Sequence, residues 1–482
     1  MGRLRNRGHV TLPDRFPAVL AAAAMGVYLL VVVGATTSLT EAAAACGGWP
    51  ACGNGAALPT ATEGWIALGH RVLAVVVGLL VALSAALAWR DGADRRVRAA
   101  LSVALVVYPA QAGVGALVAV GDLPAALGSA HLLLGVGIFG TVLAALAWWL
   151  ETETGAPDDA PEGFEPGTDH LPPVEDAPEP DIPSATLPRL KATAAAYFRL
   201  MKPRLMWLLC LVAAAAMALA EPVAAGGGPG FTPYVVAATL VGGALSIGAS
   251  GTFNHVFERD VDKRMQRTSD RPLATDLVPV SHALAFGGSL ALVSLALFWT
   301  VNPLTAALGL VAIAFYSVVY TLVLKPNTVQ NTVIGGAAGA LPALIGWAAV
   351  TGEVGGGGLL LAAVIFLWTP AHFYNLALAY KDDYERGGFP MMPVVRGETT
   401  TRRHILWYLG ATLVAAVALA AAADPLGALY AVVGVAVGAV FLWTVVQLHY
   451  EQTESAAFRA FHASNAYLGL LLFAVVVDAL VV

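Results

Sequence analysis

The stretch NHVFERDVDKRMQRTSDRPL, residues 254–273, places four acidic and five basic residues directly behind a long apolar run. The chain as a whole is only 12% charged, so such a cluster is unusual within it. If a helix continues through the start of the stretch, Asn254, Glu258 and Asp262 follow one another every four residues and share one face. The stretch therefore predicts a helix end with an amide and two carboxylates stacked on one side.

This stack has the chemistry of a Mg²⁺ site. Mg²⁺ takes oxygen ligands and usually binds through one or two carboxylates together with substrate phosphates. The same stretch supplies five bases that suit a phosphate group, namely Arg259, Lys263, Arg264, Arg267 and Arg271. The alternative is a positive-inside loop between two membrane helices, which needs bases but not an ordered row of carboxylates.

The composition predicts an all-α polytopic membrane protein. The chain is 58% hydrophobic with a mean hydropathy of +0.72, whereas soluble domains are about 45–50% apolar. Eleven of its 32 acidic residues lie between Glu151 and Asp181, where there is no Lys or Arg. The Pro-rich tract 151–190 therefore reads as a disordered linker, and the rest of the chain has more bases than acids. Nothing in this pattern suggests a nucleic-acid partner.

Apolar runs of about 20 residues, long enough to cross a bilayer, fall into two groups on either side of the linker. Four precede it, at 17–36, 66–89, 99–120 and 125–149. Nine follow it, at 205–222, 233–253, 280–299, 304–324, 329–350, 358–379, 405–423, 427–448 and 463–481. We therefore expect a four-helix transmembrane bundle in residues 1–150 and a nine-helix transmembrane bundle in residues 191–482.

The bases also predict an orientation. In the second bundle nearly all of them fall in alternate loops, at 254–279, 325–327, 380–404 and 449–462, while the intervening loops have none. The N-terminal segment before the first span is basic as well. The positive-inside rule then places the N-terminus and these loops in the cytoplasm, with the protein in the cell membrane.

A second polar cluster opens on the same predicted face. It runs YKDDYERGGFPMMP over residues 380–393, and Asn375 and Asp383 repeat the eight-residue separation of Asn254 and Asp262. Two such clusters opposite one another suggest a metal-bridged diphosphate whose lipid tail lies in the bilayer. The implied reaction is prenyl transfer, in which Mg²⁺ and bases stabilise the departing pyrophosphate.

These motifs resemble the UbiA superfamily of intramembrane prenyltransferases and, within it, the protoheme IX farnesyltransferases, which make haem O. The resemblance covers about residues 195–482. It rests on residues 254–273, on WTPAHF at 368–373, on Asp383-Tyr384 with PMMP at 390–393, and on Tyr320 with Lys325. Glu258 stands where the family usually has Asp, which keeps the charge and lengthens its reach.

The resemblance implies transfer of a farnesyl group from farnesyl diphosphate to a vinyl group of haem B. By position it implies a Mg²⁺–diphosphate site made of Asn254, Glu258, Asp262 and Asp383. The implied phosphate contacts are Arg259, Arg267, Arg271, Lys325 and Arg386. His255 and His372 are candidates for contact with haem, and a packing role is an open alternative for each.

Two other functions stay open. One keeps the prenyl chemistry but changes the acceptor to a quinone precursor or a lipid, which the RTSDRPL and WTPAHF blocks argue against. The other is a non-catalytic haem carrier or oxidase-assembly factor. A carrier has no use for Mg²⁺–diphosphate ligands, so two intact carboxylate clusters argue against that function.

The first group of helices carries its own candidate site. His70 and His131 both fall near the extracytoplasmic ends of their predicted spans, where two imidazoles facing across a bundle suit axial haem ligation. Two unrelated packing histidines are the alternative. Cys46 and Cys52 share the loop before His70, on the oxidising side where a disulfide is allowed.

The segment CGGWPAC at 46–52, with His70 and His131, resembles one half of the haem A synthase family. That family has two such halves, and it has a glutamate about one turn before the first histidine, where this chain has Ala67. The resemblance implies haem bound by the first bundle. It also suggests haem A synthase or terminal oxidase subunits as partners.

Overall fold

The computed structural model describes residues 15–39, 46, 48–49, 52, 59–120, 125–156, 164, 166–167, 186–226, 228–423 and 426–481. These residues are helical or in turns and bends, with no strand among them. They divide into two compact units, 1–155 and 156–482. The predicted basic N-terminal segment and the greater part of the predicted linker lie outside the described residues.

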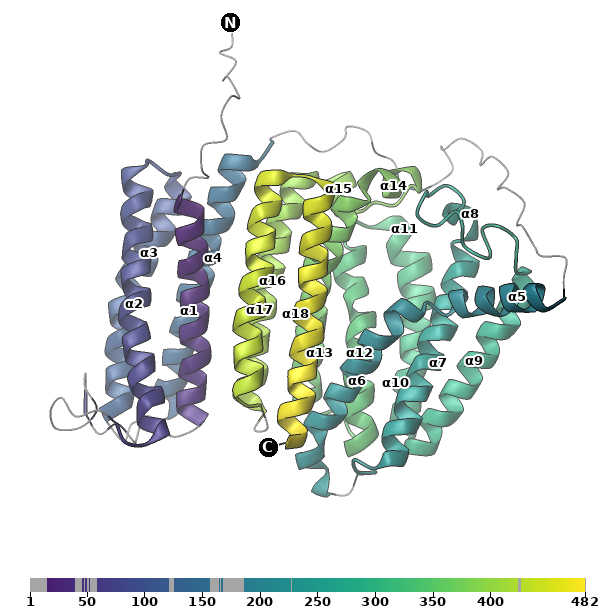
Figure 1. Cartoon of the computed structure of the whole chain (residues 1–482), viewed down its shortest axis with the longest axis horizontal. Helices are drawn as coiled ribbons and strands as arrows, with labels where there is room; N and C mark the ends of the chain where they lie inside the picture. Colours follow the sequence, from purple (N-terminus) through teal and green to yellow (C-terminus); the bar gives the residue numbers. More distant parts are fainter. Residues whose placement is uncertain are drawn as a thin grey trace, which may run out of the picture. The chain divides into compact units, whose positions relative to one another are not determined.

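The described residues of unit 1 form a four-helix bundle, whose helices run side by side in Figure 1. Its helices are α1 (Arg15–Leu39), α2 (Thr62–Arg90), α3 (Arg95–Val120) and α4 (Ala125–Thr154). α1 packs on α2 and α4, and α3 packs on the same two helices. Aromatic pairs fill the core between α1 and α4: Phe16 meets the edge of Trp149 at 4.5 Å and Tyr28 lies 5.7 Å from Phe139. The predicted boundary at residue 150 falls inside α4.

The described residues of unit 2 contain nine long apolar helical segments. They are α6 (Pro203–Ala220), α7 (Pro233–Phe257), α9 (Val280–Val301), α10 (Pro303–Ala314) with its continuation, α12 (Asn331–Thr351), α13 (Gly356–Ala379), α16 (Glu398–Ala422), α17 (Ala428–Glu451) and α18 (Glu454–Val481). α10 continues through a π-helix, η2 (Phe315–Leu324), into α11 (Lys325–Asn327). In the part of the chain that is described, thirteen helices are long and apolar enough to span a membrane. This confirms the predicted polytopic all-α architecture.

Several spans are longer than their apolar runs. α16 begins at Glu398 rather than near 405, and α18 begins at Glu454 rather than near 463. The added turns contain Arg402 and Arg459. Glu and Arg are good helix formers, so the helix continues into the polar region where hydropathy alone marks an end.

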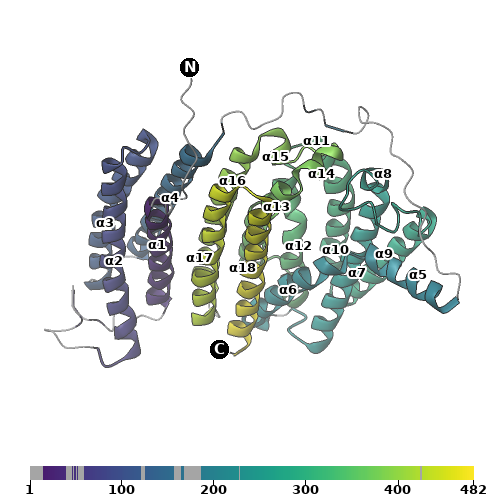
Figure 2. The same cartoon turned by 45° about the horizontal axis from the view of Figure 1, so that its top comes forward.

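Short elements connect these spans. They are α5 (Thr186–Leu200), the 3₁₀ helix η1 (Glu221–Gly226), α8 (Arg259–Asp262), α14 (Lys381–Arg386) and α15 (Met392–Val395). α8, α11, α14 and α15 lie at one end of unit 2 in both views (Figures 1 and 2). Both polar clusters of the sequence therefore lie at the same end of one bundle.

Small residues allow close helix packing. A Cβ on Gly346 of α12 would lie 2.3 Å from the backbone oxygen of Ala213 in α6. Helices in membranes commonly approach one another at glycine and alanine, because packing rather than hydrophobic burial holds them together. Such contacts hold α6 and α12 closely against one another.

Candidate active site

The predicted row of Asn254, Glu258 and Asp262 survives a break in the helix. α7 ends at Phe257, and Glu258 leaves helical geometry with φ −96° and ψ 6°. The i→i−4 pattern nevertheless continues, because Glu258 N donates to Asn254 O at 2.9 Å and Asp262 N donates to Glu258 O at 2.7 Å. The three side chains are buried, at 2%, 5% and 2% exposure.

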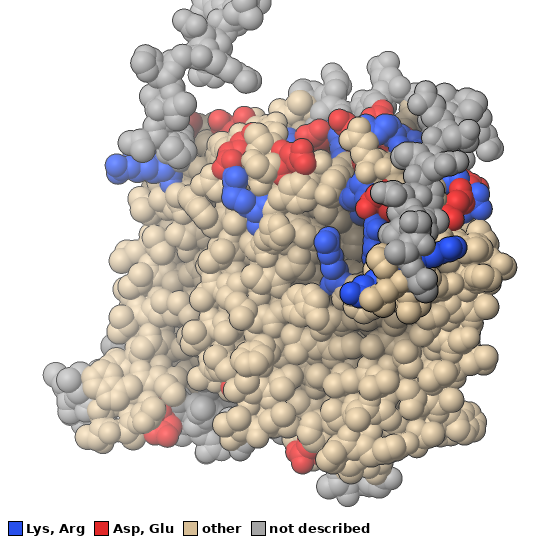
Figure 3. All heavy atoms as spheres, turned by 45° about the vertical axis from the view of Figure 1, so that its right-hand side comes forward, with Lys and Arg blue, Asp and Glu red and all other residues tan. Residues whose placement is uncertain are grey.

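Each carboxylate of this row is paired with a base. Lys325 Nζ lies 2.6 Å from Glu258 Oε1. Arg271 Nη1 donates to both oxygens of Asp262 at 2.8 Å and lies 3.9 Å from Glu258. Buried charges are costly unless they are paired and hydrogen-bonded. On the face shown in Figure 3, Lys and Arg side chains gather around a hollow near this end of unit 2.

The pairing separates the two acids electrostatically. Burial raises the pKa of Glu258, but the charges of Lys325, Lys202 and Arg271 outweigh it, so the pKa lies below its usual value. Burial also raises the pKa of Asp262, and together with the Glu258 charge it outweighs the opposing charge and hydrogen bond of Arg271, so that pKa lies above its usual value. Glu258 therefore stays ionised at lower pH than an ordinary glutamate. Asp262 is harder to ionise than an ordinary aspartate, and the charge of Arg271 favours its ionised form.

Three further residues complete the cluster, and sequence reasoning did not identify them. Lys202 caps α6 with a left-handed backbone, φ 54°, and its ammonium donates to Asn254 Oδ1 and, at 3.1 Å, to Tyr316 Oη. Thr321 Oγ1 accepts from Asn254 Nδ2 at 3.1 Å. The sequence offered one indication for Lys202, because it is a base directly before a predicted span. It offered no indication for Thr321, because only the π-helix brings that residue to the site.

The second polar cluster touches the first, and Asp383 makes the contact. Its carboxylate accepts the backbone N–H groups of Gln266 and Arg267 at 2.9 and 3.0 Å, and it also pairs with Arg386. Burial raises the pKa of Asp383, but these hydrogen bonds outweigh it and leave the pKa below its usual value. The carboxylate thus anchors the loop after α8, a task the sequence did not predict.

Arg267 and Arg259 differ in what they contact. The Arg267 guanidinium lies over the rings of Tyr380 and Tyr384, at 5.1 and 5.6 Å from their centroids. It therefore joins the two polar clusters. Arg259 instead lies 3.7 Å from Asp276 and from its neighbour Asp260, outside the buried row. The structure gives its predicted phosphate contact no support.

The two histidines of unit 2 also differ. His372 stacks between Trp368 and Phe461, with both ring centroids 4.3 Å away, and its Nδ1 lies 2.7 Å from Ser464 Oγ. These contacts favour a packing role. His255 is buried at 4% exposure, and its Nδ1 has no hydrogen-bond partner in the described structure. Its role stays open.

The oxygen atoms of Asn254, Glu258 and Asp262 fit Mg²⁺ in type. No group of three or more His, Cys, Asp or Glu residues suited to a metal occurs in the described parts of the chain. A cation held by two carboxylates, an amide and substrate phosphates needs no third acid. The present partners of these atoms, Lys325, Arg271 and Lys202, are themselves cations, which indicates that the row is built for positive charge.

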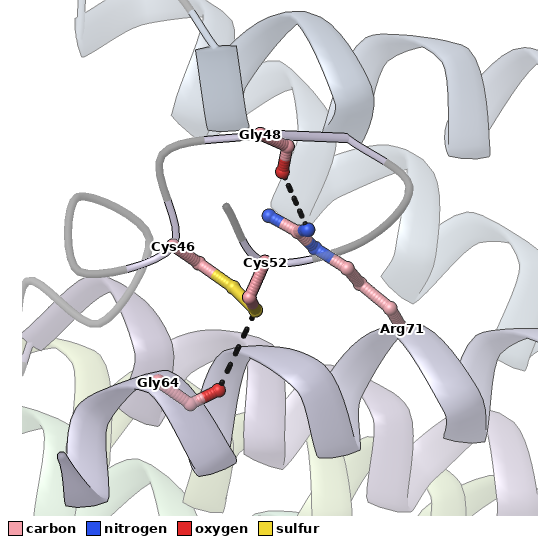
Figure 4. Close-up of a disulfide and its surroundings, with 5 residues drawn as sticks. All are labelled: Cys46, Gly48, Cys52, Gly64 and Arg71. Atoms are coloured by element: carbon pink, nitrogen blue, oxygen red, sulfur yellow. Dashed lines mark hydrogen bonds between the residues drawn. A yellow bond between two sulfur atoms is a disulfide. The ribbon is translucent and has the colours of Figure 1, made fainter. Parts of the chain in front are cut away.

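Unit 1 holds a separate polar site near the start of α2. Cys46 and Cys52 form a disulfide, and Cys52 Sγ lies 3.8 Å from Gly64 O (Figure 4). Arg71 Nη1 donates to Gly48 O at 2.6 Å, which ties the disulfide loop to the helix (Figure 4). The loop is therefore fixed beside the residue that follows His70.

His70 lies in α2 and His131 in α4. Each has a buried Nδ1 with no hydrogen-bond partner among the residues described. Each imidazole also rests on a glycine: a Cβ would lie 3.2 Å from His70 Cε1 at Gly34, and 2.6 Å from His131 Cε1 at Gly115. Each ring thus packs closely against a glycine and keeps a ring nitrogen with no hydrogen-bond partner in the described structure.

The chain is similar to several known proteins. A model of the UbiA prenyltransferase family matches residues 199–471, within unit 2. Proteins named protoheme IX farnesyltransferase from Haloquadratum walsbyi and Haloarcula marismortui are 61% and 62% identical over 97% and 96% of this chain, and over 97% and 98% of their own lengths. A protein of the same name from Mycobacterium avium is 42% identical over 62% of this chain and 95% of its own length.

A solved structure of a UbiA homolog from Archaeoglobus fulgidus bound to GPP and Mg²⁺ resembles the chain more distantly. It covers 58% of this chain and 99% of its own, with a TM-score of 0.43 and 19% identity. That level is too low for a comparison of sites.

Proposed function

The chain belongs to the UbiA prenyltransferase family and, within it, to the protoheme IX farnesyltransferases, and on that premise we propose that unit 2 makes haem O. It transfers the farnesyl group of farnesyl diphosphate to a vinyl group of haem B. The family match lies within unit 2, and the mycobacterial relative carries the same name with a match to only 62% of this chain. Both findings favour assigning the transfer to one unit.

The observation that carries this proposal is the pair of buried acid–base contacts, Glu258 with Lys325 and Asp262 with Arg271. In a protein that only had to fold, similar-sized apolar residues would be at least as stable as buried ion pairs. Charges kept here at such cost indicate a charged substrate. In a diphosphate bound with Mg²⁺, the phosphate oxygens supply negative charge for the two bases, and the metal ion supplies positive charge for the two carboxylates.

The proposed mechanism assigns roles to these side chains. Asn254, Glu258 and Asp262 would hold Mg²⁺, which would supply Lewis-acid stabilisation of the leaving pyrophosphate. Arg271 and Lys325, released from the two carboxylates, then contact phosphate oxygens. Asp383 keeps the loop between them in place through the backbone of Gln266 and Arg267. Their combined charge favours departure of pyrophosphate, and the farnesyl cation adds to the vinyl group of haem B. Water then adds to the carbocation left on the former vinyl group and loses a proton, which gives the hydroxyethylfarnesyl side chain.

The site faces the cytoplasm in this proposal, because the positive-inside rule applies to its basic loops. That orientation also puts the diphosphate head in water and the farnesyl chain in the bilayer. A quinone or lipid acceptor would use the same diphosphate site. The protoheme name of the similar chains favours haem over those acceptors.

The test compares haems extracted from membranes that express wild type, Asp262→Asn or Asp260→Asn, after feeding farnesyl diphosphate and Mg²⁺. We expect haem O from wild type and from Asp260→Asn, whose carboxylate is exposed and outside the row. We expect a loss of at least about 100-fold in Asp262→Asn, on the scale of an electrostatic transition-state contact. Haem O at wild-type levels in Asp262→Asn, or a prenylated quinone or lipid in place of haem O, would overturn the proposal.

We propose a second function for unit 1, haem binding by His70 and His131. The unpartnered Nδ1 atoms and the glycines opposite each ring favour it. Purified His70→Ala should lose the absorbance signature of bis-histidine haem while still forming haem O. His282→Ala, an exposed histidine of α9, is the control. An unchanged haem spectrum in His70→Ala would contradict this assignment.

A further inference from the structure

The amide of Asn254 has an oxygen end and a nitrogen end, and only the oxygen can bind a metal ion. An Asn side chain fits its site almost equally well in either orientation, so its neighbours must select one. Here the Lys202 ammonium faces one end. An ammonium has three donors and no acceptor, so the amide atom that faces it must be the oxygen.

Thr321 makes the same selection at the other end. Its hydroxyl has a single proton, which it donates to Tyr316 O at 2.8 Å. Its oxygen can therefore only accept in the contact with Asn254 at 3.1 Å, and the atom that donates is Asn254 Nδ2. With the nitrogen held by Thr321, the oxygen of Asn254 is directed towards Lys202.

The π-helix explains why Thr321 occupies this position. In an α-helix, residues four apart share a face, so Tyr320 would follow Tyr316. The wider turn of η2 puts Thr321 after Tyr316, and its hydroxyl reaches back five residues. Lys325 follows one turn later and reaches Glu258. π-helical turns occur often at functional sites, and this one aligns three side chains with the metal-binding row.

We propose that Thr321 is a positioning residue for the transfer reaction, which fixes the Asn254 amide with its oxygen towards the Mg²⁺–diphosphate. The ammonium of Lys202 holds that oxygen until substrate arrives. This inference rests on the proposed role of Asn254 in the site. Thr321 itself touches no substrate and acts through one hydrogen bond.

The test measures metal–pyrophosphate binding without turnover. Calorimetry on the purified full chain, in detergent and without haem or farnesyl diphosphate, gives the affinity for Mg²⁺ with inorganic pyrophosphate. Thr321→Val keeps the shape but removes the acceptor, and we expect affinity to fall about tenfold, the lower end for residues that orient a metal ligand. Thr321→Ser keeps the hydroxyl and should bind Mg²⁺ with pyrophosphate at the wild-type affinity. Thr412→Val is the matched control, since Thr412 is a buried threonine of α16 bonded to Tyr408 O.

A double variant separates orientation from general damage. A carboxylate has two equivalent oxygens and needs no orienting partner, so Thr321→Val should cost almost nothing in an Asn254→Asp background. An equal tenfold loss in both backgrounds, or no loss in Thr321→Val alone, would overturn the inference. If Asn254→Ala binds Mg²⁺–pyrophosphate as wild type does, the failure lies instead in the proposed metal site.

Discussion

The carboxylate row of unit 2 and the histidine pair of unit 1 treat their buried polar groups in opposite ways. In unit 2 each buried carboxylate of the row has a base, Lys325 for Glu258 and Arg271 for Asp262. In unit 1, His70 and His131 each leave a buried ring nitrogen without a hydrogen-bond partner in the described structure, and Gln111 leaves its Oε1 in the same state. The carboxylates of unit 2 are thus neutralised by bases of the same chain, whereas these polar atoms of unit 1 have no hydrogen-bond partner among the described residues.

The difference follows from the kind of group that each unit buries. An unpaired buried carboxylate or ammonium costs several kcal/mol, so a charged site must supply its own counter-charges before a substrate arrives. A neutral imidazole nitrogen or amide oxygen left without a partner costs only about 1–3 kcal/mol. The pairing of buried polar groups is therefore expected to differ between a site built from charged side chains and a site built from neutral imidazoles.

The largest expected effect comes from removing a base that neutralises a buried carboxylate of unit 2. Lys325→Met removes the nearest base from the buried charge of Glu258, leaves only the longer 3.9 Å contact with Arg271, and should destabilise the protein by about 3–5 kcal/mol. Adding Glu258→Gln removes that charge and should recover most of the loss, while activity stays abolished. Denaturant unfolding in detergent measures both variants.

The control for this prediction is an exposed pair. Arg459 and Glu451 pair with side chains 49% and 40% exposed, and Arg459→Met should cost no more than about 1 kcal/mol. Equal losses from Lys325→Met and Arg459→Met would show that the buried pairs are not special. The contrast between the two units would then not hold for unit 2.

A smaller effect probes the space around the histidines of unit 1. In Gly115→Ala the new methyl group would lie 2.6 Å from His131 Cε1, so the ring must shift. Overpacking of about 1.4 kcal/mol corresponds to about a tenfold loss of haem affinity, measurable by absorbance titration. Gly113→Ala on the same helix meets nothing within 4 Å and should bind haem normally. Identical titrations for the two variants would exclude His131 from the haem site.

The smallest effect concerns the loop held by Asp383. Its pKa is lowered in the folded protein, so its contribution to stability is complete above the unfolded value of about 4. That contribution is lost as the pH falls through the lowered value. Proteolysis of the segment between α8 and α9 should therefore accelerate only in strong acid, and Asp383→Asn should be cut rapidly at every pH. A wild-type profile in Asp383→Asn would remove the loop-anchoring role.

Sequence alone anticipated much of the fold and part of the site. Hydropathy is a local property, so the two groups of spans could be read directly. The four-residue spacing of Asn254, Glu258 and Asp262 is equally local, and it holds although the helix breaks at Glu258. The ends of α16 and α18 were misplaced because charged residues continue a helix after the apolar run has ended.

Contacts between distant parts of the chain were decided only by the tertiary structure. Lys202 reaches Asn254 across 52 residues, and Lys325 and Thr321 reach Glu258 and Asn254 across 67. No spacing rule covers such separations, because they depend on how whole helices pack. The sequence determined that acids, bases and an amide would gather at one end of the second bundle. The packing, and the π-helical turn within it, determined which base meets which acid and which way the amide faces.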